Sequence, residues 1–345
     1  MDPINARPEL LKQMNLARIR RVLRDRGTAT RAEIVEATHI SFTTVRALLA
    51  ELLERGELEV AGQDESSGGR KAQRYHFRPD CCYGAAICIS GLEMYGLLVN
   101  ICGEVVQKQR LDGRGGDFEP AIIEFLDELT KSHALRAIGI GVPGVVEGGC
   151  YWKKDTSNEL YKVDLGEKIT KRYGIPVLLE NDLNATAIGF GRCYVREFPE
   201  ERTENTNMAY IHFEKGCISA GFISGGQIVR GHHNFAGELG LIPMDNGQLM
   251  DEALAFTMDD RSYTNRIIHM ICWICAILNP QYVALGGSDL RSDCVGPIGD
   301  GLSALLPDRM NTEILYAPDV WHDYFDGMAW LTAEAMFEKT QPVFS

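Results

Sequence analysis

The sequence has 345 residues, of which 45% are hydrophobic and 24% charged, and its formal net charge is −13. This length suits two or three folded domains. No apolar run is long enough to cross a bilayer, and the first ten residues, MDPINARPEL, lack the apolar core of a signal peptide. These features exclude a membrane-embedded or secreted class, so we expect a cytoplasmic protein whose ten cysteines are reduced.

The first part of the chain has the spacing of a helix-turn-helix. The pattern predicts a helix over 18–26 that Gly27 ends, a second helix after Thr30, and a third over 42–55. Ser41 is the expected N-cap of the third helix, because its hydroxyl can accept the first free backbone N–H groups. The start of such a recognition helix contacts base edges in duplex DNA. The residues predicted to contact DNA there are Ser41, Thr43, Thr44 and Arg46.

A basic hairpin follows the predicted helices. Strands are predicted over 58–61 and 73–77, with a turn over 62–72 whose two adjacent glycines, Gly68 and Gly69, allow positive φ. The order of three helices and a wing predicts a winged helix-turn-helix, and the alternative is a small helical domain with a solvated hairpin. The side chains just beyond the tip, which we expect to meet backbone phosphates, are Arg70 and Lys71.

Charge is divided unevenly along the chain. Residues 1–80 carry 14 basic and 12 acidic side chains, whereas the remainder carries 21 basic and 36 acidic ones. The acidic remainder should repel nucleic acid, so only the N-terminal part is expected to approach it. The alternative, that the acidic surface simply confers solubility, is compatible with the same division.

Strands and helices alternate from residue 84 onward, which is typical of an α/β fold. The remainder is long enough for two lobes with a cleft between them. Strands are predicted over 84–99 (a hairpin broken at 90–91), 135–142, 176–179, 208–213, 220–223 and 282–285, and helices over 119–132, 165–173, 184–191, 264–278 and 325–338.

One of these helices carries a Cys-x-x-Cys pair. Cys272 and Cys275 lie within the apolar helix predicted over 264–278. Buried cysteines commonly serve as small apolar residues, so core packing is the favoured interpretation. Redox or metal chemistry is the alternative.

Taken together in chain order, these motifs resemble the ROK family of sugar kinases and sugar-responsive repressors. The resemblance covers nearly the whole chain and implies an actin-like, ribonuclease-H-like body with two lobes around a cleft. It implies a winged helix-turn-helix over 1–80 and a body over 81–345. Lobe one is expected over about 81–180 plus a C-terminal helix over 325–340, and lobe two over about 181–324. The motifs are Ser67-Gly68-Gly69-Arg70, GVPG at 141–144, END at 180–182, AGELG at 236–240, Asn279-Pro280 and LGG at 285–287.

The chain departs from the family's kinases at both phosphate loops. Those kinases carry Asp-x-Gly-Gly-Thr-Lys where residues 88–93 read CISGLE, so the acid is lost and Glu93 replaces the lysine. They carry Gly-Thr-Gly-x-Gly-x-Gly where residues 215–221 read KGCISAG, and side chains there obstruct the close wrapping of a phosphate. We therefore expect no kinase activity, no catalytic residue and no cofactor.

The family's zinc element is also missing. Leu241 stands where the family has a histidine, and residues 242–271 contain no cysteine. A structural zinc site needs about four nitrogen or sulfur ligands, and none can be assembled here. We expect no metal ion.

The resemblance also implies the residues of a ligand site. In the family an Asn-Asp pair and the glutamate of the AGE motif bond sugar hydroxyls, and these positions are Asn181, Asp182 and Glu238. Carboxylates and amides suit a polyol. The alternatives are another polar ligand or none, with Asp182 capping a helix and Glu238 pairing with a base. The backbone at Gly141 and Gly144 is expected to line the site, and His233 is either a contact or an exposed loop residue, as is His232.

The sequence therefore predicts a DNA-binding regulator, a repressor in our interpretation, that binds an operator as a homodimer and senses a sugar or sugar-like molecule. One rival is a constitutive DNA-binding protein whose body only dimerises. The other is a sugar kinase that carries a DNA-binding extension. The sequence leaves open the ligand, the operator and the sign of regulation.

Overall fold

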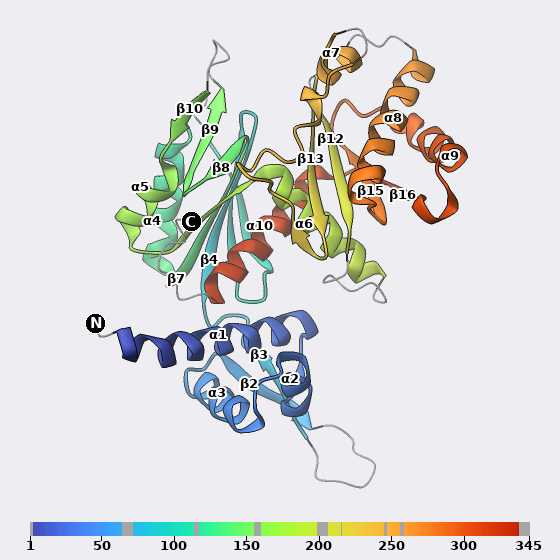
Figure 1. The fold of residues 1–345 in the computed structure, drawn as a ribbon. Coiled ribbons are helices and arrows are strands. Elements are labelled where there is room, and N and C mark those ends of the chain that lie inside the picture. The colour runs from blue at the N-terminus through green and yellow to red at the C-terminus, as the bar shows by residue number, and fades with distance from the viewer. Residues whose placement is uncertain are drawn as a thin grey trace.

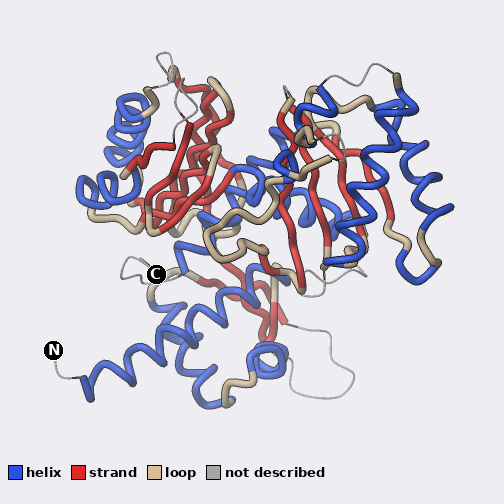
Figure 2. The backbone as a smooth tube through the Cα atoms, turned by 45° about the horizontal axis from the view of Figure 1, so that its top comes forward, coloured by secondary structure: helices blue, strands red, loops and turns tan. Residues whose placement is uncertain are grey.

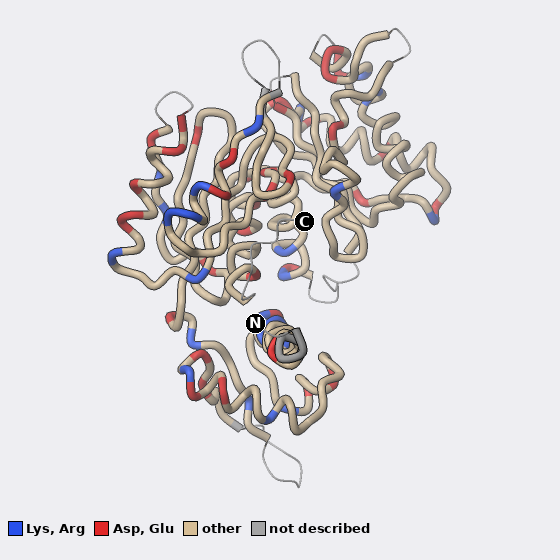
Figure 3. Tube along the Cα trace, turned by 60° about the vertical axis from the view of Figure 1, so that its left-hand side comes forward, with Lys and Arg blue, Asp and Glu red and all other residues tan. Residues whose placement is uncertain are grey.

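The computed structural model describes residues 3–63, 72–113, 117–154, 160–198, 206–214, 216–244, 247–255 and 259–337. The chain forms a small N-terminal domain beneath a body that contains two large sheets (Figure 1). No helix among these residues is long and apolar enough to cross a membrane. Acidic residues are distributed over both halves of the body, whereas the N-terminal domain mixes both signs (Figure 3).

The N-terminal domain is a winged helix-turn-helix. Thr30 and Glu33 form a capping box that starts the second helix, and His39 adopts φ 55° in the turn before the third. The wing strands lie within a three-stranded sheet of order β1-β3-β2. The elements are α1 (Pro3–Arg26), β1 (Ala29–Thr30), α2 (Arg31–Thr38), α3 (Phe42–Glu54), β2 (Leu58–Gln63) and β3 (Gln73–Phe77).

The first half of the body is a five-stranded sheet of order β11-β7-β4-β5-β6. Two helices pack on one face, and a small sheet of order β10-β9-β8 lies beside it. Its elements are β4 (Tyr83–Ser90), β5 (Glu93–Asn100), β6 (Val105–Leu111), α4 (Glu119–Ser132), β7 (Leu135–Val142), β8 (Val145–Glu147), β9 (Cys150–Lys154), β10 (Leu160–Val163), α5 (Leu165–Tyr173) and β11 (Val177–Asn181).

The second half is another five-stranded sheet, of order β14-β13-β12-β15-β16. Helices α8 and α9 cover one face, and α6 packs on the other (Figure 2). Its elements are α6 (Asp182–Glu197), β12 (Met208–Glu214), β13 (Cys217–Ser224), β14 (Gln227–Ile228), α7 (Met250–Ala255), α8 (Asp260–Leu278), β15 (Tyr282–Gly286), α9 (Val295–Leu305) and β16 (Glu313–Ala317).

The last helix, α10 (Val320–Phe337), returns to the first sheet and crosses α6 between the two halves (Figure 1). Two glycines permit this crossing. A Cβ atom at Gly189 would lie 1.8 Å from the Asp323 carbonyl oxygen, and one at Gly327 would lie 1.8 Å from the Ala185 carbonyl oxygen. The two backbones are thus in direct contact, and neither glycine can gain a side chain without moving a helix.

The structure extends several predicted elements. α1 begins at Pro3 instead of residue 18, α6 runs to Glu197, and α10 begins at Val320 instead of residue 325. The expected extension of the last helix to 340 lies partly outside the described residues. The helices and strands that the sequence pattern did not indicate are β1, β6, β8, β9, β10, β14, β16, α7 and α9.

We predict that Gly327→Ala lowers the free energy of unfolding by about 1–3 kcal/mol, because the added methyl group must displace the backbone of α6. Urea denaturation measures the change. The matched control is Gly296→Ala in α9, where a Cβ meets no atom within 4 Å. The control should be neutral or slightly stabilising. Equal stability of Gly327→Ala and wild type would contradict the close crossing.

Candidate functional site

The start of α3 is exposed and capped as the sequence predicts. The Ser41 hydroxyl accepts the Thr44 backbone N–H at 3.2 Å and lies 2.8 Å from the Thr44 hydroxyl. Thr43 and Arg46 are exposed on the same turns, while Val45 is buried in the core. This end of the helix therefore presents polar side chains outward, as direct reading of a DNA groove requires.

The tip of the wing is not described. Arg70 and Lys71, predicted to contact phosphates, lie outside the described residues. Arg31, in α2, lies beside α3 and was not among the residues predicted to contact DNA. Its guanidinium group donates to the Tyr75 hydroxyl at 2.7 Å and lies 5.7 Å from the centre of the exposed Phe42 ring.

The Asn-Asp pair lies at the junction of β11 and α6. Asn181 is the N-cap of α6, with its side-chain oxygen accepting the Leu183 and Asn184 N–H groups at 3.0 Å. Its amide nitrogen donates to the Gly144 carbonyl oxygen at 3.0 Å. The N-cap of α6 is therefore Asn181 and not Asp182, which was the alternative interpretation. Asp182 also accepts the Leu183 N–H, at 2.9 Å.

Burial raises the pKa of Asp182 to about 7, and the charges of Glu214 and Glu238 act in the same direction. The negative charges of Glu214 and Glu238 therefore act on the Asp182 carboxyl group at the N-terminal end of α6. Glu238 is exposed and immediately precedes the short helix at Leu239–Leu241. A site of this kind offers concentrated hydrogen-bond acceptors.

The segment between β14 and Glu238 bridges the two halves of the body. Arg230 forms an ion pair with the buried carboxylate of Glu180, and the Asn234 amide donates to the Val146 carbonyl oxygen. His233 is exposed, and its Nδ1 lies 3.4 Å from a Glu147 carboxylate oxygen. His233 thus contacts β8, a partner that the sequence pattern did not predict.

The two predicted backbone positions have different surroundings. Gly144 adopts φ 104° and accepts the Asn181 amide. A Cβ atom at Gly141 would lie 2.2 Å from the Tyr324 hydroxyl, so this glycine lets α10 approach the sheet. The Tyr324 hydroxyl lies 3.2 Å from the Ile89 nitrogen and 3.1 Å from its oxygen.

Both phosphate-loop positions are occupied by internal interactions. At the first, Tyr324 bonds Ile89, and Glu93 forms an ion pair with Arg110 at 2.9 Å. At the second, a carboxylate oxygen of Asp251 accepts the Ile218 N–H at 2.7 Å. A carboxylate beside this hairpin repels a phosphate and takes a donor that would otherwise bind one. The contribution of Asp251 was not visible in the sequence, because the residue lies in α7.

The N-terminal domain is joined to the body by a buried ion-pair group. The Glu57 side chain is 2% exposed and accepts Arg20 of α1 at 2.8 Å and 3.0 Å. Its other carboxylate oxygen lies 3.2 Å from both terminal nitrogens of Arg136, in β7. Breaking such a buried group leaves an uncompensated charge, so these three residues fix the domain against the body.

A second contact connects the N-terminal domain to both crossing helices. The guanidinium carbons of Arg24 in α1 and Arg192 in α6 each lie 3.2 Å from the centre of the Trp330 ring in α10. Two cations cannot occupy the same face, so the ring lies between them. The side chain of Arg24 is 3% exposed and lies 2.7 Å from a Glu334 oxygen. The sequence pattern did not indicate this contact.

Two surface hollows lie away from these residues. One of about 500 Å³ is lined by residues including Gln281, Ser303 and Asn311, and another of about 230 Å³ by residues including Arg110, Glu124 and Glu128. Neither is lined by a predicted ligand-site residue.

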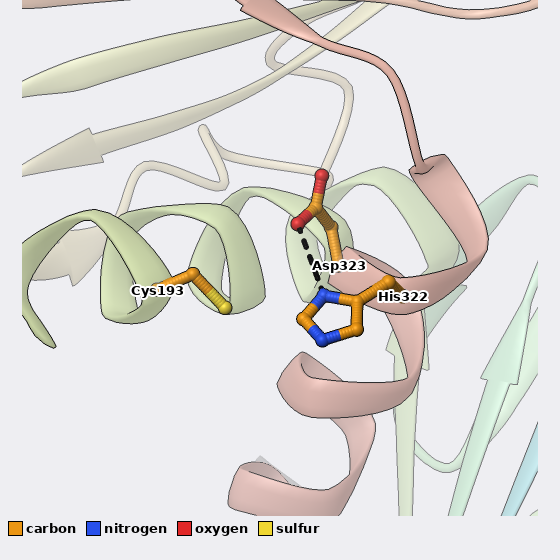
Figure 4. Close-up of side chains that lie close together, drawn as sticks. All are labelled: Cys193, His322 and Asp323. Atoms are coloured by element: carbon orange, nitrogen blue, oxygen red, sulfur yellow. Dashed lines mark ion pairs between the residues drawn. The ribbon is translucent and has the colours of Figure 1, made fainter. Parts of the chain in front are cut away.

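Two groups of residues carry side chains of the kind that bind metal ions, namely the cysteine pair of α8 and a cluster between α6 and α10. Cys275 is buried and Cys272 packs against the same core, as the favoured interpretation predicts. Among the described residues, Cys193, His322 and Asp323 bring potential metal-ligand atoms within 4.8 Å of one another (Figure 4). The sequence gave no indication of this cluster, because its members come from α6 and α10.

We predict that Asp182→Asn becomes more stable than wild type as the pH rises from 4 to 8. The folded protein holds the Asp182 proton up to a pKa of about 7, whereas the unfolded chain releases it near 3.8, so wild type loses stability between these values. The difference should reach about 1–3 kcal/mol and disappear below pH 4.

Unfolding titrations between pH 4 and 8 measure this difference in the free energy of unfolding. Asp127→Asn is the control, for which the change in stability should have the opposite sign. Its pairs with Arg172 and Tyr173 hold the pKa of Asp127 below the ordinary value, so this variant should lose stability above pH 4. A pH-independent difference for Asp182→Asn would show that the carboxylate is fully solvated.

Three comparisons relate the chain to known proteins. The ROK family model matches residues 85–255. The xylose repressor of Bacillus subtilis (strain 168) is 25% identical over 246 residues, which are 68% of this chain and 62% of the repressor. The chain therefore matches less than two thirds of that relative's length.

Solved structures resemble the fold. A ROK family transcriptional regulator described as a homolog of the E. coli MLC protein has a TM-score of 0.72 at 16% identity, covering 95% of this chain and 98% of that one. A ROK family glucokinase from Streptomyces griseus, solved with glucose and AMPPNP, has a TM-score of 0.52 at 17% identity, covering 72% and 99%. Residues 85–255 of the chain thus match the ROK family model, and the described residues have a fold similar to that of solved ROK family proteins.

Proposed function

We propose that this protein is a transcriptional repressor that binds duplex DNA through its N-terminal domain and releases it when a sugar or sugar-like molecule binds the body. The observation that carries the proposal is the continuous set of contacts from Asp182 to α1. Helix α6 starts at Asp182, crosses α10 through Gly189 and Gly327, and meets Trp330 through Arg192. Arg24 of α1 contacts the other face of that ring.

The route offers a physical basis for sensing. A ligand that bonds Asn181, Asp182 and Glu238 would draw the β11–α6 junction toward the segment that precedes the Leu239–Leu241 helix. Because α6 and α10 are in backbone contact, a shift of α6 must move α10 or alter the crossing. The ligand changes DNA binding only to the extent that it binds one arrangement better than the other.

The proposed DNA-binding form is a homodimer. α1 exposes Leu10, Leu11 and Met14, and α8 exposes Trp273 and Ile277, the latter with 79% of its surface accessible. Two exposed apolar groups on one chain are typical of surfaces that associate. A twofold pair of N-terminal domains would read two half-sites, whose spacing depends on the arrangement of the bodies.

The absence of kinase activity is part of the proposal. Asp251 and Tyr324 occupy the backbone groups at the two phosphate-loop positions, and Glu93 opposes a phosphate at the first. Sugar-dependent ADP production that disappears in Asp182→Ala would favour the kinase alternative. A panel of sugars that leaves the melting temperature unchanged would favour the constitutive DNA-binding alternative.

We predict that recognition-helix and wing variants have different effects on DNA binding. Arg46→Ala should change the preferred sequence, because the side chain is exposed near the start of α3. Arg70→Ala and Lys71→Ala should weaken binding to all duplexes and reduce the salt slope by about one for each lost phosphate contact. Selection from a genomic library followed by anisotropy titrations at several salt concentrations measures both effects.

The control is Lys171→Ala, which removes an exposed charge from α5 and should leave both quantities unchanged. Failure of the selection to enrich any motif would overturn the assignment as a DNA-binding regulator.

We predict that Trp330→Leu separates ligand binding from DNA release. The variant should keep its DNA affinity without ligand and its thermal shift with the active sugar, since neither surface is altered. The factor by which the sugar weakens DNA binding should fall from the 5–150-fold range typical of allosteric coupling to below about threefold. Anisotropy titrations with and without the sugar measure this factor.

Two variants complete the experiment. Asp182→Ala should lose both the thermal shift and the release of DNA, because it removes the proposed ligand contact. Trp152→Leu, in β9, is the aromatic control and should behave as wild type. Full coupling in Trp330→Leu would exclude the route through α10.

A further inference from the structure

Three side chains that are far apart in the sequence meet at the surface where α6 crosses α10. Cys193 comes from the last part of α6, and His322 and Asp323 come from the first turn of α10 (Figure 4). One sulfur, one nitrogen and one oxygen atom lie within 4.8 Å of one another. This group takes no part in the proposed sugar site, which lies at the opposite end of α6.

The crossing of α6 and α10 holds the three side chains close together. Residues four apart lie on the same face of a helix, so Cys193 projects from the face on which Gly189 contacts α10. The atom nearest to a Cβ at Gly189 is the carbonyl oxygen of Asp323 itself. The backbones that carry the thiol and the carboxylate are therefore held together by the close approach of the two helices at Gly189.

The Asp323 carboxylate is buried, and few cations or hydrogen-bond donors in the described part of the chain balance its charge. The Asp323 side chain is 9% exposed, and its one ion pair among the described residues is with His322, at 3.8 Å. The nearby guanidinium groups of Arg192 and Arg196 instead pair with Asp326, at 3.4 Å and 3.1 Å. An ionised carboxylate removed from water requires a close cation or several donors, so this position favours a bound positive charge.

The donor set selects the kind of cation. Thiolate and imidazole exclude the hard ions Mg²⁺ and Ca²⁺, which take oxygen ligands. Sulfur, nitrogen and carboxylate oxygen together suit Zn²⁺, which is bound at about 2.0–2.3 Å by such ligands in tetrahedral geometry. Ligand atoms in such a site lie less than 4 Å apart, and the exposed His322 side chain can turn to close the remaining distance. Exposure also leaves a fourth position open to water.

We propose that Cys193, His322 and Asp323 form a three-ligand site for Zn²⁺ or a similar borderline-soft divalent ion. The site differs from the family's zinc element, whose absence led us to expect no metal. The inference does not depend on the proposed repressor function, because it concerns metal binding by the folded chain alone. A bound ion would tie α6 to α10 at their crossing.

The test uses the full chain, stripped of metal with a chelator and titrated with Co²⁺ as a spectroscopic probe. We expect a sulfur-to-cobalt charge-transfer band that saturates at one equivalent per chain and is displaced by Zn²⁺. Cys193→Ser should abolish the band. His322→Gln, at an exposed position that folding does not require, should weaken Zn²⁺ binding at least about tenfold.

Cys272→Ser is the matched control, since Cys272 is also partly buried in a helix but lies in α8. It should keep the band and its stoichiometry. Circular dichroism shows whether each variant folds. The proposal is overturned if wild type gives no saturable band or if Cys193→Ser keeps the band. It is also overturned if folded His322→Gln binds Zn²⁺ as tightly as wild type, or if folded Cys272→Ser loses the band.

Discussion

The backbone contact between α6 and α10 is the constraint on which the rest of the body depends. Gly189 and Gly327 are each placed where any side chain would collide with a carbonyl oxygen of the other helix. α6 covers the second sheet and α10 covers the first, so this contact and the bridging segment between β14 and Glu238 together determine how the two halves meet. Packed interfaces of this kind shift between discrete arrangements and do not deform smoothly. In the proposed function, this crossing would be the hinge between the ligand-free and the ligand-bound arrangement.

The N-terminal domain is attached to the same hinge. Glu57, buried between Arg20 and Arg136, holds the domain against β7, while Arg24 reaches the Trp330 ring beside the crossing. The Glu57 ion pairs join the domain to strand β7. The Arg24–Trp330 contact joins it to α10, which crosses α6. In the proposed repressor, a change at the crossing would move the N-terminal domain about the Glu57 anchor. The two contacts would then connect the lobes of the body to the proposed DNA-binding surface.

Local patterns in the sequence predicted local structure well and tertiary contacts poorly. The helices at 119–132 and 165–173 and the strand at 135–142 match the structure because their periodicity and end signals lie within a few residues. β8, β9 and β10 were missed because they form short strands whose pairing supplies their stability. Arg24, Arg192 and Trp330 look like ordinary charged or apolar helix residues, and only the fold brings them together. The family resemblance predicts Asn181, Asp182 and Glu238 as ligand contacts, which stays a prediction, and it gave no indication of the Asp251 carboxylate at the second phosphate-loop position.

Asp251 and Tyr324 occupy backbone groups at the two positions that correspond to the kinases' phosphate loops. A hairpin that binds a phosphate needs free backbone N–H groups and an environment without negative charge. Here Ile218 donates to Asp251, and the Tyr324 hydroxyl bonds Ile89 at the other turn. Each replacement satisfies a backbone group internally, so the fold no longer needs a nucleotide to complete it. Tyr324 also lies on α10, beside Gly141 of the first sheet. Tyr324 therefore bonds the first phosphate-loop position and also helps to position α10, the helix that contacts the N-terminal domain.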